Sequence, residues 1–376
     1  MQFTPQRLER VYRSMRRDEI DALVITRRQD VQYLTGHLGT SHNAPIGCVI
    51  TEGEQPHLII SDAQEDSITS ETILGEVRTF ALASSVDDQF RPYNKAYWEE
   101  VLKSLNELNK SKNMIGLQFE ALSVKDYETV KTLLPDAGFR DFSQALWRLR
   151  QIKDAAEIDA IQQAVNVAEI GVRTALEIVA SGKSEDEASL EIEAAMRGAG
   201  AQQRGIRAAV LSADHARSPF AQPGSKRIQT TDFVVLDITV SHSGYFAEIA
   251  RTIHLGKPTE KQRKLFDYIL NILKSAEKVM IPELTIDDAV SQILKKAGKA
   301  FPPNTTIRPL GSSIGLDLSE PPFIADGSQY SLREGMVFTL HPIGYVSDIG
   351  CVKIADVFLV KHDSVESLGS LARETL

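Results

Sequence analysis

Two acidic residues, Asp237 and Glu248, lie in a stretch whose alternating pattern predicts a β-hairpin over residues 233–256. If the hairpin turns at residues 242–243, the two side chains lie directly opposite each other, with Cβ atoms roughly 5 Å apart. Like charges so close repel, so a metal ion, a shared proton, a buried base or a cationic ligand must neutralise them. Arg251 is not the counter-charge, because strand alternation places it on the other face. The alternative is a solvated pair on an exposed sheet face.

The elements that must position this hairpin form the second half of the chain. An apolar stripe predicts a helix over residues 146–180, and Ser184 with Glu187 has the spacing of a capping box that begins the next helix. Further helices are expected over residues 260–279 and 286–299. Strands are expected over residues 233–239, 245–255, 336–341 and 351–361. This pattern predicts an α+β domain in which helices back an antiparallel sheet.

The first half of the chain alternates short apolar runs with helical windows. The windows 95–109 and 124–134 predict helices. Strands are expected over residues 21–26, 46–51, 57–60 and 114–119. We therefore predict two domains, an α/β N-terminal domain at residues 1–145 and an α+β C-terminal domain at residues 146–376.

Composition narrows the classes of function. The chain has a net charge of −9 and no long run of Lys and Arg, so it is a poor candidate for binding nucleic acid. No apolar run approaches the length of about 18 residues that a membrane span needs, and the N-terminus lacks the apolar stretch of a signal peptide. Cys48 and Cys351 lie too far apart for a metal-binding motif. We expect a cytoplasmic protein without nucleic-acid or membrane partners.

Ordered motifs along the whole chain resemble those of the creatinase/aminopeptidase P/prolidase family. The hairpin with Asp237 and Glu248 resembles the family's two-aspartate hairpin. The other matching segments are Tyr-Leu-Thr-Gly (33–36), the helix at 149–161, Ser-Ser-Ile-Gly-Leu-Asp-Leu-Ser-Glu-Pro-Pro (312–322), Gly-Met-Val-Phe-Thr-Leu-His-Pro (335–342) and Val-Lys-Ile-Ala-Asp (352–356). The resemblance implies the family's pita-bread fold for the second domain.

The resemblance also implies where a metal centre would lie. The family holds two metal ions with Asp, Asp, His, Glu and Glu, and the matching residues here are Asp237, Glu248, Ser312, His341 and Ala355. Most of the oxygen donors that a divalent pair needs are thus missing. We expect no metal cofactor, and the alternative is one divalent ion on Asp237, Glu248 and His341.

We expect His341 to be the general base, with a hairpin carboxylate orienting its ring. It would activate water or, alternatively, Ser312 as a nucleophile, and a purely structural imidazolium is the third possibility. Two further family histidines correspond to Phe220 and Ser319. The catalytic candidates are therefore His341, Glu248, Asp237 and Ser312, and the substrate-binding candidates are Asp237, Glu248, Phe220, Ser319 and Tyr245.

Without a metal, two facing carboxylates would form a negative pocket that suits a guanidinium or substituted ammonium group. The leading hypothesis is a metal-independent, creatinase-like enzyme that hydrolyses a C–N bond in a small cationic or zwitterionic substrate, with lyase chemistry still open. The alternatives are an inactive prolidase-like binding module and a mononuclear metal-dependent Xaa-Pro-type peptidase. The resemblance also implies a homodimer.

Overall fold

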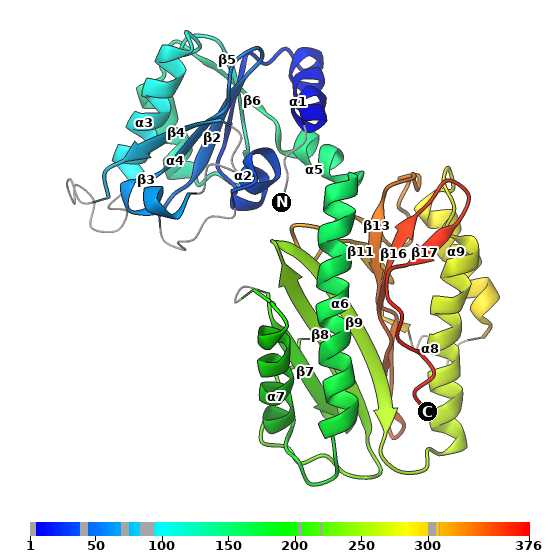
Figure 1. The fold of residues 1–376 in the computed structure, drawn as a ribbon. Helices are drawn as coiled ribbons and strands as arrows, with labels where there is room; N and C mark the ends of the chain where they lie inside the picture. The colour runs from blue at the N-terminus through cyan, green and yellow to red at the C-terminus, as the bar shows by residue number, and fades with distance from the viewer. Residues whose placement is uncertain are drawn as a thin grey trace. The chain divides into compact units, whose positions relative to one another are not determined.

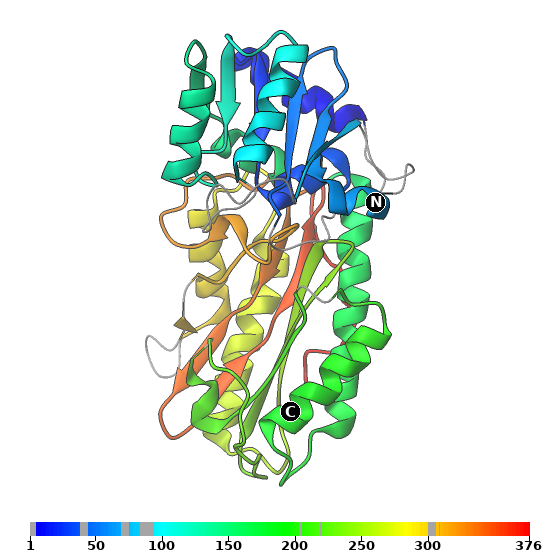
Figure 2. The same cartoon turned by 90° about the vertical axis from the view of Figure 1, so that its left-hand side faces the viewer.

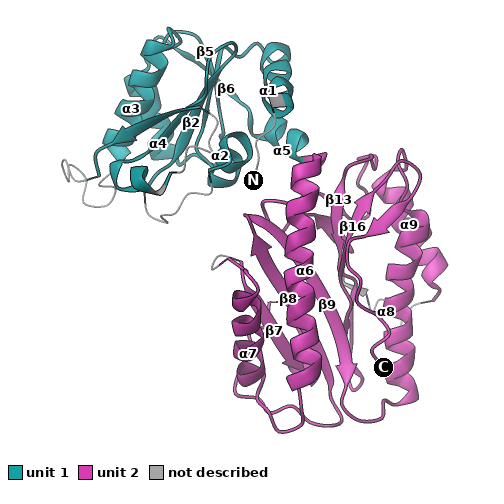
Figure 3. Cartoon of the chain, in the orientation of Figure 1, with its two compact units in different colours: residues 1–150 teal, residues 151–376 magenta. Residues whose placement is uncertain are grey.

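The computed structural model describes residues 5–37, 44–68, 75–82, 94–202, 205–218, 220–299, 306–307 and 309–376. The chain divides into two compact units, residues 1–150 and 151–376 (Figure 3). The boundary falls near the end of helix α5 (Ser143–Gln151), whereas the sequence suggested a boundary after residue 145, near the start of this helix. No helix in the described ranges combines the length and apolar character needed to cross a membrane.

Unit 1 is built on a mixed six-stranded sheet in the order β4-β3-β2-β1-β5-β6 (Figure 1). Its strands are β1 (Ala22–Ile25), β2 (Gly47–Thr51), β3 (His57–Ser61), β4 (Glu76–Phe80), β5 (Met114–Leu117) and β6 (Gly138–Asp141). Its helices are α1 (Pro5–Arg17), α2 (Arg28–Thr35), α3 (Asn94–Glu107), α4 (Val124–Leu133) and the short η1 (Asp62–Ser67), with α5 at its end. Strands β1, β2 and β3 are buried along their whole length, as their apolar runs require. This is the α/β domain predicted from the sequence.

Unit 2 contains the long helices. They are α6 (Ala155–Ile178), α7 (Glu185–Gly198), α8 (Glu260–Val279) and α9 (Ile286–Ala297), with the short η2 (Ala213–Arg217). The helix expected over residues 146–180 is divided into α5 and α6, because Asp154 caps α6 in a capping box with Glu157. The capping box predicted at Ser184 and Glu187 is confirmed at the start of α7.

Among the described residues of unit 2, three antiparallel sheets have the orders β7-β8-β9, β10-β14-β15 and β12-β11-β13-β16-β17. Their strands are β7 (Arg207–Ser212), β8 (Phe233–His242), β9 (Tyr245–His254), β10 (Thr306–Ile307), β11 (Gly311–Ser313), β12 (Glu320–Ile324), β13 (Val337–Leu340), β14 (Ile343–Val346), β15 (Gly350–Lys353), β16 (Asp356–Val360) and β17 (Val365–Ser367). Helix α6 lies across β8 and β9, while α8 contacts β14, β15 and β17 (Figures 1 and 2). One apolar core joins α8 and α9 to β13, β15 and β16, which confirms the helix-backed antiparallel arrangement predicted for the second domain.

Candidate functional site

The hairpin that carries the two carboxylates is β8–β9, and its register differs from the expected one. The turn residues are 243–244, both with positive φ (51° and 82°), as a two-residue type I′ turn requires. Glu248 therefore pairs with Thr239, and Asp237 pairs with Ala250. A shift of two residues keeps both carboxylates on one face but makes them diagonal neighbours, typically about 7–8 Å apart.

The ammonium group of Lys353 lies between these carboxylates. Its Nζ is 2.6 Å from Glu248 Oε1 and 2.9 Å from Asp237 Oδ2. Lys353 is the last residue of β15, and its backbone is held by Thr252 of β9. The Thr252 hydroxyl donates to the Lys353 carbonyl at 2.8 Å and accepts from the Lys353 N–H at 2.9 Å. One ammonium group therefore lies between two acids. The carboxylates are diagonal neighbours with space between them, and the hydrogen bonds between β9 and β15 hold Lys353 beside that space.

Arg207, at the start of β7, brings a second positive charge. Its Nη1 is 3.1 Å from Asp237 Oδ2. Two carboxylates thus meet two cations, so the expectation of a negative pocket is wrong. Sequence reasoning missed both basic residues. The available signal was a lysine inside the apolar run Cys-Val-Lys-Ile-Ala (351–355), because a buried ammonium needs a partner.

Ion pairing keeps Glu248 and Lys353 ionised although both side chains are buried. Burial raises the pKa of the Glu248 carboxyl, but the charges and hydrogen bonds of Lys353 and His341 outweigh it and hold that pKa well below its usual value. Burial likewise opposes the charge on Lys353, yet Asp237 and Glu248 hold its pKa above the usual value. Lys353 and Glu248 are therefore both ionised at neutral pH.

His341 follows β13 and contacts Glu248. Its Nδ1 lies 3.0 Å from Glu248 Oε2, and no described residue hydrogen-bonds its Nε2. The side chain is 26% exposed, so solvent reaches part of the ring. Ser312, on β11, instead accepts a hydrogen bond from Ser319 Oγ at 3.0 Å. Because no hydrogen bond joins Ser312 to His341 in the described part of the chain, the serine-nucleophile alternative lacks the contact that would activate it.

The other predicted substrate-binding residues lie in contrasting environments. Tyr245 is fully buried and its hydroxyl donates to Glu157 at 3.1 Å, so it supports the hairpin from the core and does not face a substrate. Phe220 is 86% exposed. The next carbonyl, that of Ala221, accepts a hydrogen bond from Arg207 Nη2 at 3.1 Å, which ties the Phe220 loop to the charged cluster. The expectation for Tyr245 is corrected because its hairpin position points inward.

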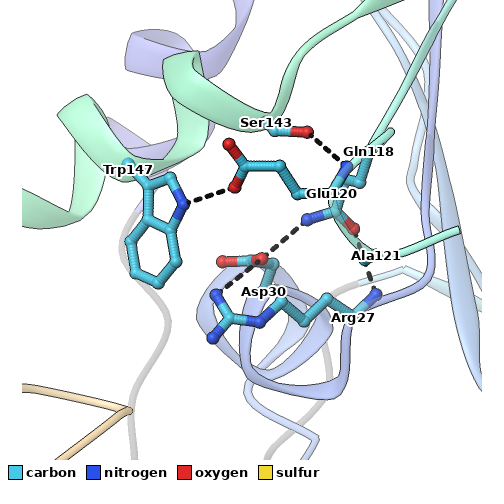
Figure 4. A pocket seen from close by; sticks show the side chains of 7 residues that line it. All are labelled: Arg27, Asp30, Gln118, Glu120, Ala121, Ser143 and Trp147. Carbon is cyan, nitrogen blue, oxygen red and sulfur yellow. Dashed lines mark hydrogen bonds and ion pairs between the residues drawn. The ribbon is translucent and has the colours of Figure 1, made fainter. Parts of the chain in front are cut away.

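Unit 1 holds a separate cavity of about 410 Å³ (Figure 4). Its lining residues are Arg27, Asp30, Gln118, Glu120, Ala121, Ser143 and Trp147. The polar side chains pair with one another: Gln118 Nε2 donates to Asp30 at 2.7 Å, and the Trp147 indole donates to Glu120 at 3.0 Å. These bonds connect α2, α5 and the end of β5, which is a structural role. The candidate site is therefore the charged cluster of unit 2.

Two family profiles match the chain. Residues 7–152 match the Creatinase/Prolidase N-terminal domain, and residues 159–362 match Metallopeptidase family M24. The second match spans more than half of the chain and includes every candidate site residue named above. The chain belongs to metallopeptidase family M24.

Relatives match along the whole chain. The Xaa-Pro dipeptidase of Pyrococcus furiosus is 27% identical over 99% of both chains. Among solved structures, the prolidase of Pyrococcus horikoshii has a TM-score of 0.81 at 25% identity, covering 99% of this chain and 100% of that one. The Xaa-Pro dipeptidase of Bacillus anthracis has a TM-score of 0.85 at 24% identity over 99% of both chains. These matches confirm the two-domain pita-bread fold.

The same comparisons overturn three expectations. The creatinase-like, metal-independent reading and the inactive binding module are wrong, because the family is one of metallopeptidases and the matched relatives are prolidases and Xaa-Pro dipeptidases. The expectation of no metal cofactor is wrong for the same reason, since the family points to divalent metal ions. Membership of a peptidase family supports a hydrolase of C–N bonds.

The donors of this chain, as arranged, do not fit such ions. Within the described ranges no three His, Cys, Asp or Glu side chains are grouped so that they could hold a metal. Lys353 Nζ lies between Asp237 and Glu248, where a second cation would meet like charge. One observation favours a bound cation: Asp237 Oδ1 is buried, and no described residue donates to it. Family and geometry therefore disagree at this position.

Replacing Glu248 with Gln should destabilise the protein, because Lys353 and His341 both lose a charged partner. We expect a loss of about 1–3 kcal/mol at pH 7, measured by urea unfolding. A carboxyl whose pKa is lowered in the folded state stabilises the protein above its unfolded pKa of about 4.3, and this contribution is lost as the pH falls. The difference between Glu248→Gln and wild type should therefore shrink below about pH 4.

Glu366→Gln is the matched control, because Glu366 pairs with Lys361 at 3.1 Å while more than half exposed. It should change the free energy of unfolding by less than about 0.5 kcal/mol. Equal effects of the two substitutions would contradict a special role for the buried pair.

Proposed function

We propose that this protein is an Xaa-Pro-type dipeptidase that hydrolyses the peptide bond of small zwitterionic dipeptides. Similarity to Xaa-Pro dipeptidases over the full chain supports the substrate class. The observation that carries the proposal is the Glu248–His341 pair, in which a buried carboxylate holds a partly exposed imidazole at 3.0 Å. A carboxylate that fixes the ring of a histidine is the usual arrangement of a general base.

In this proposal His341 handles the protons of the reaction. The Nδ1–H group donates to Glu248, which leaves a lone pair on Nε2. Nε2 takes a proton from water as the water oxygen bonds to the carbonyl carbon of the peptide. The C–N bond then breaks as that proton passes to the leaving nitrogen. Glu248 stays ionised and stabilises the intermediate imidazolium.

Two neighbouring residues provide recognition of the substrate. The Arg207 side chain is 30% exposed, and a guanidinium group suits the carboxylate of a dipeptide. The exposed ring of Phe220 lies in the loop tied to Arg207, and it offers an apolar face to a prolyl ring. Ser319, which donates a hydrogen bond to Ser312, adds a hydroxyl group to the same proposed site.

Location and assembly complete the proposal. We infer a cytoplasmic protein because Cys48 and Cys351 are both buried free thiols. Burial raises the pKa of the Cys351 thiol to about 12, which keeps it protonated and unreactive. A homodimer is inferred from the family resemblance, and sedimentation velocity measures it directly.

The test is hydrolysis of Leu-Pro compared with Leu-Ala, followed by release of free amino acid, with and without added Mn²⁺. We expect Leu-Pro to be cleaved at least about tenfold faster, because a prolyl ring and a fixed carboxylate match the recognition residues. Equal cleavage of both peptides would contradict the Xaa-Pro preference. Cleavage of neither, in either buffer, would refute the proposed function.

A further inference from the structure

We propose that the Lys353 ammonium group takes the place of a divalent cation between Asp237 and Glu248, so that these residues do not fit a metal ion while the lysine charge is present. The inference concerns the site of the proposed function, but it requires no substrate and no turnover. It also accounts for the disagreement between the metallopeptidase family and the geometry of this chain.

The position of the ammonium is the first observation. It contacts one oxygen of each carboxylate, at 2.6 Å and 2.9 Å, and only 8% of the residue is exposed. Its backbone is bonded on both sides to Thr252 of the neighbouring strand. A group held so closely places one positive charge beside both acids, as a bound cation otherwise would.

The bonding of the carboxylate oxygens is the second observation. Both oxygens of Glu248 are in use, one by Lys353 and the other by His341. Asp237 Oδ2 contacts Lys353 and Arg207, whereas Oδ1 is buried without a described donor. A buried carboxylate oxygen without a donor is costly, and a cation is the partner that suits it.

Charge makes the two occupants exclusive. Asp237 and Glu248 are already balanced by Lys353 and Arg207, so a divalent ion beside them would leave two positive charges in excess. An ammonium and a divalent ion a few ångströms apart repel by several kcal/mol even when the effective dielectric constant is about 20. Removing the lysine charge should therefore strengthen metal binding.

The experiment measures Mn²⁺ binding by calorimetry in wild type and Lys353→Met, without peptide. We expect Lys353→Met to bind one Mn²⁺ per chain at least about tenfold more tightly than wild type. Lys361→Met is the matched control, because Lys361 makes an exposed pair with Glu366, and it should bind Mn²⁺ as wild type does. Adding Glu248→Gln to Lys353→Met should abolish the gain.

Equal Mn²⁺ affinity in wild type and Lys353→Met overturns the inference. Lys353→Met removes one of the two positive charges that balance the acids, so its folding is also followed by circular dichroism with and without Mn²⁺. Recovery of folded protein by Mn²⁺ supports the exchange of ammonium for metal, and failure to fold at any Mn²⁺ concentration overturns it. Calorimetry reports no catalysis, so a failure to cleave Leu-Pro would refute the proposed function and leave this result standing.

Discussion

His341→Ala is expected to lower the turnover of Leu-Pro by about a hundredfold or more, with a smaller change in KM. The variant keeps Glu248 and Lys353 in place but removes the ring nitrogen that takes a proton from water. The measurement is steady-state release of proline at pH 7. The loss should appear in kcat, because the general base acts in the transition state and does not hold the peptide.

His362→Ala is the matched control for this variant. The His362 side chain is 90% exposed and pairs with Glu334 at 3.5 Å, so its removal should leave turnover unchanged. Circular dichroism of His341→Ala distinguishes a lost base from a lost fold. Turnover that survives in a folded His341→Ala protein would remove His341 from the mechanism.

Asp356→Ala is expected to destabilise the protein by about 3–5 kcal/mol, the usual cost of breaking a buried ion pair. Asp356 Oδ1 accepts from Arg251 Nη2 at 2.9 Å, and its other oxygen accepts from Arg373. The Arg251 side chain is 1% exposed, so its charge would be left buried without a carboxylate. Urea unfolding followed by circular dichroism measures the loss.

The position of Asp356 explains why this effect should be large. Arg251 also donates to the carbonyls of Leu371 and Ala372, so the network fastens the C-terminal segment to β9 and β16. Asp363→Ala, an exposed change a few residues along, should alter stability by less than about 0.5 kcal/mol. Similar losses in both variants would show that the network adds no stability beyond surface charge.

Elements with strong local signals were predictable from the sequence. Helix α8 occupies the predicted residues 260–279, and α7 begins at the predicted capping box, because apolar periodicity and capping act over a few residues. The division between α5 and α6 was missed although Asp154 and Glu157 also form a capping box. The apolar stripe continues through this region, so it predicted one uninterrupted helix.

The register of the β8–β9 hairpin could not be predicted from local residue patterns. Its strands and its two carboxylates on one face were predicted, because side chains alternate with a period of two along a strand. The register depended on the turn, where positive φ at residues 243–244 moved the pairing by two positions. The alternation of residues along a strand cannot reveal such a shift, because a shift of two residues leaves every side chain on the same face.

The sequence by itself determined that two carboxylates share a face, that helices back the sheet, and that the chain resembles prolidases. Only the tertiary structure decided what neutralises those carboxylates. Lys353 is more than a hundred residues beyond Asp237 and Glu248, and it reaches them because β9 and β15 meet through Thr252. A charge is stabilised by whatever lies within a few ångströms in space, and contacts between distant strands are set by the packing of the whole unit and not by local residue patterns.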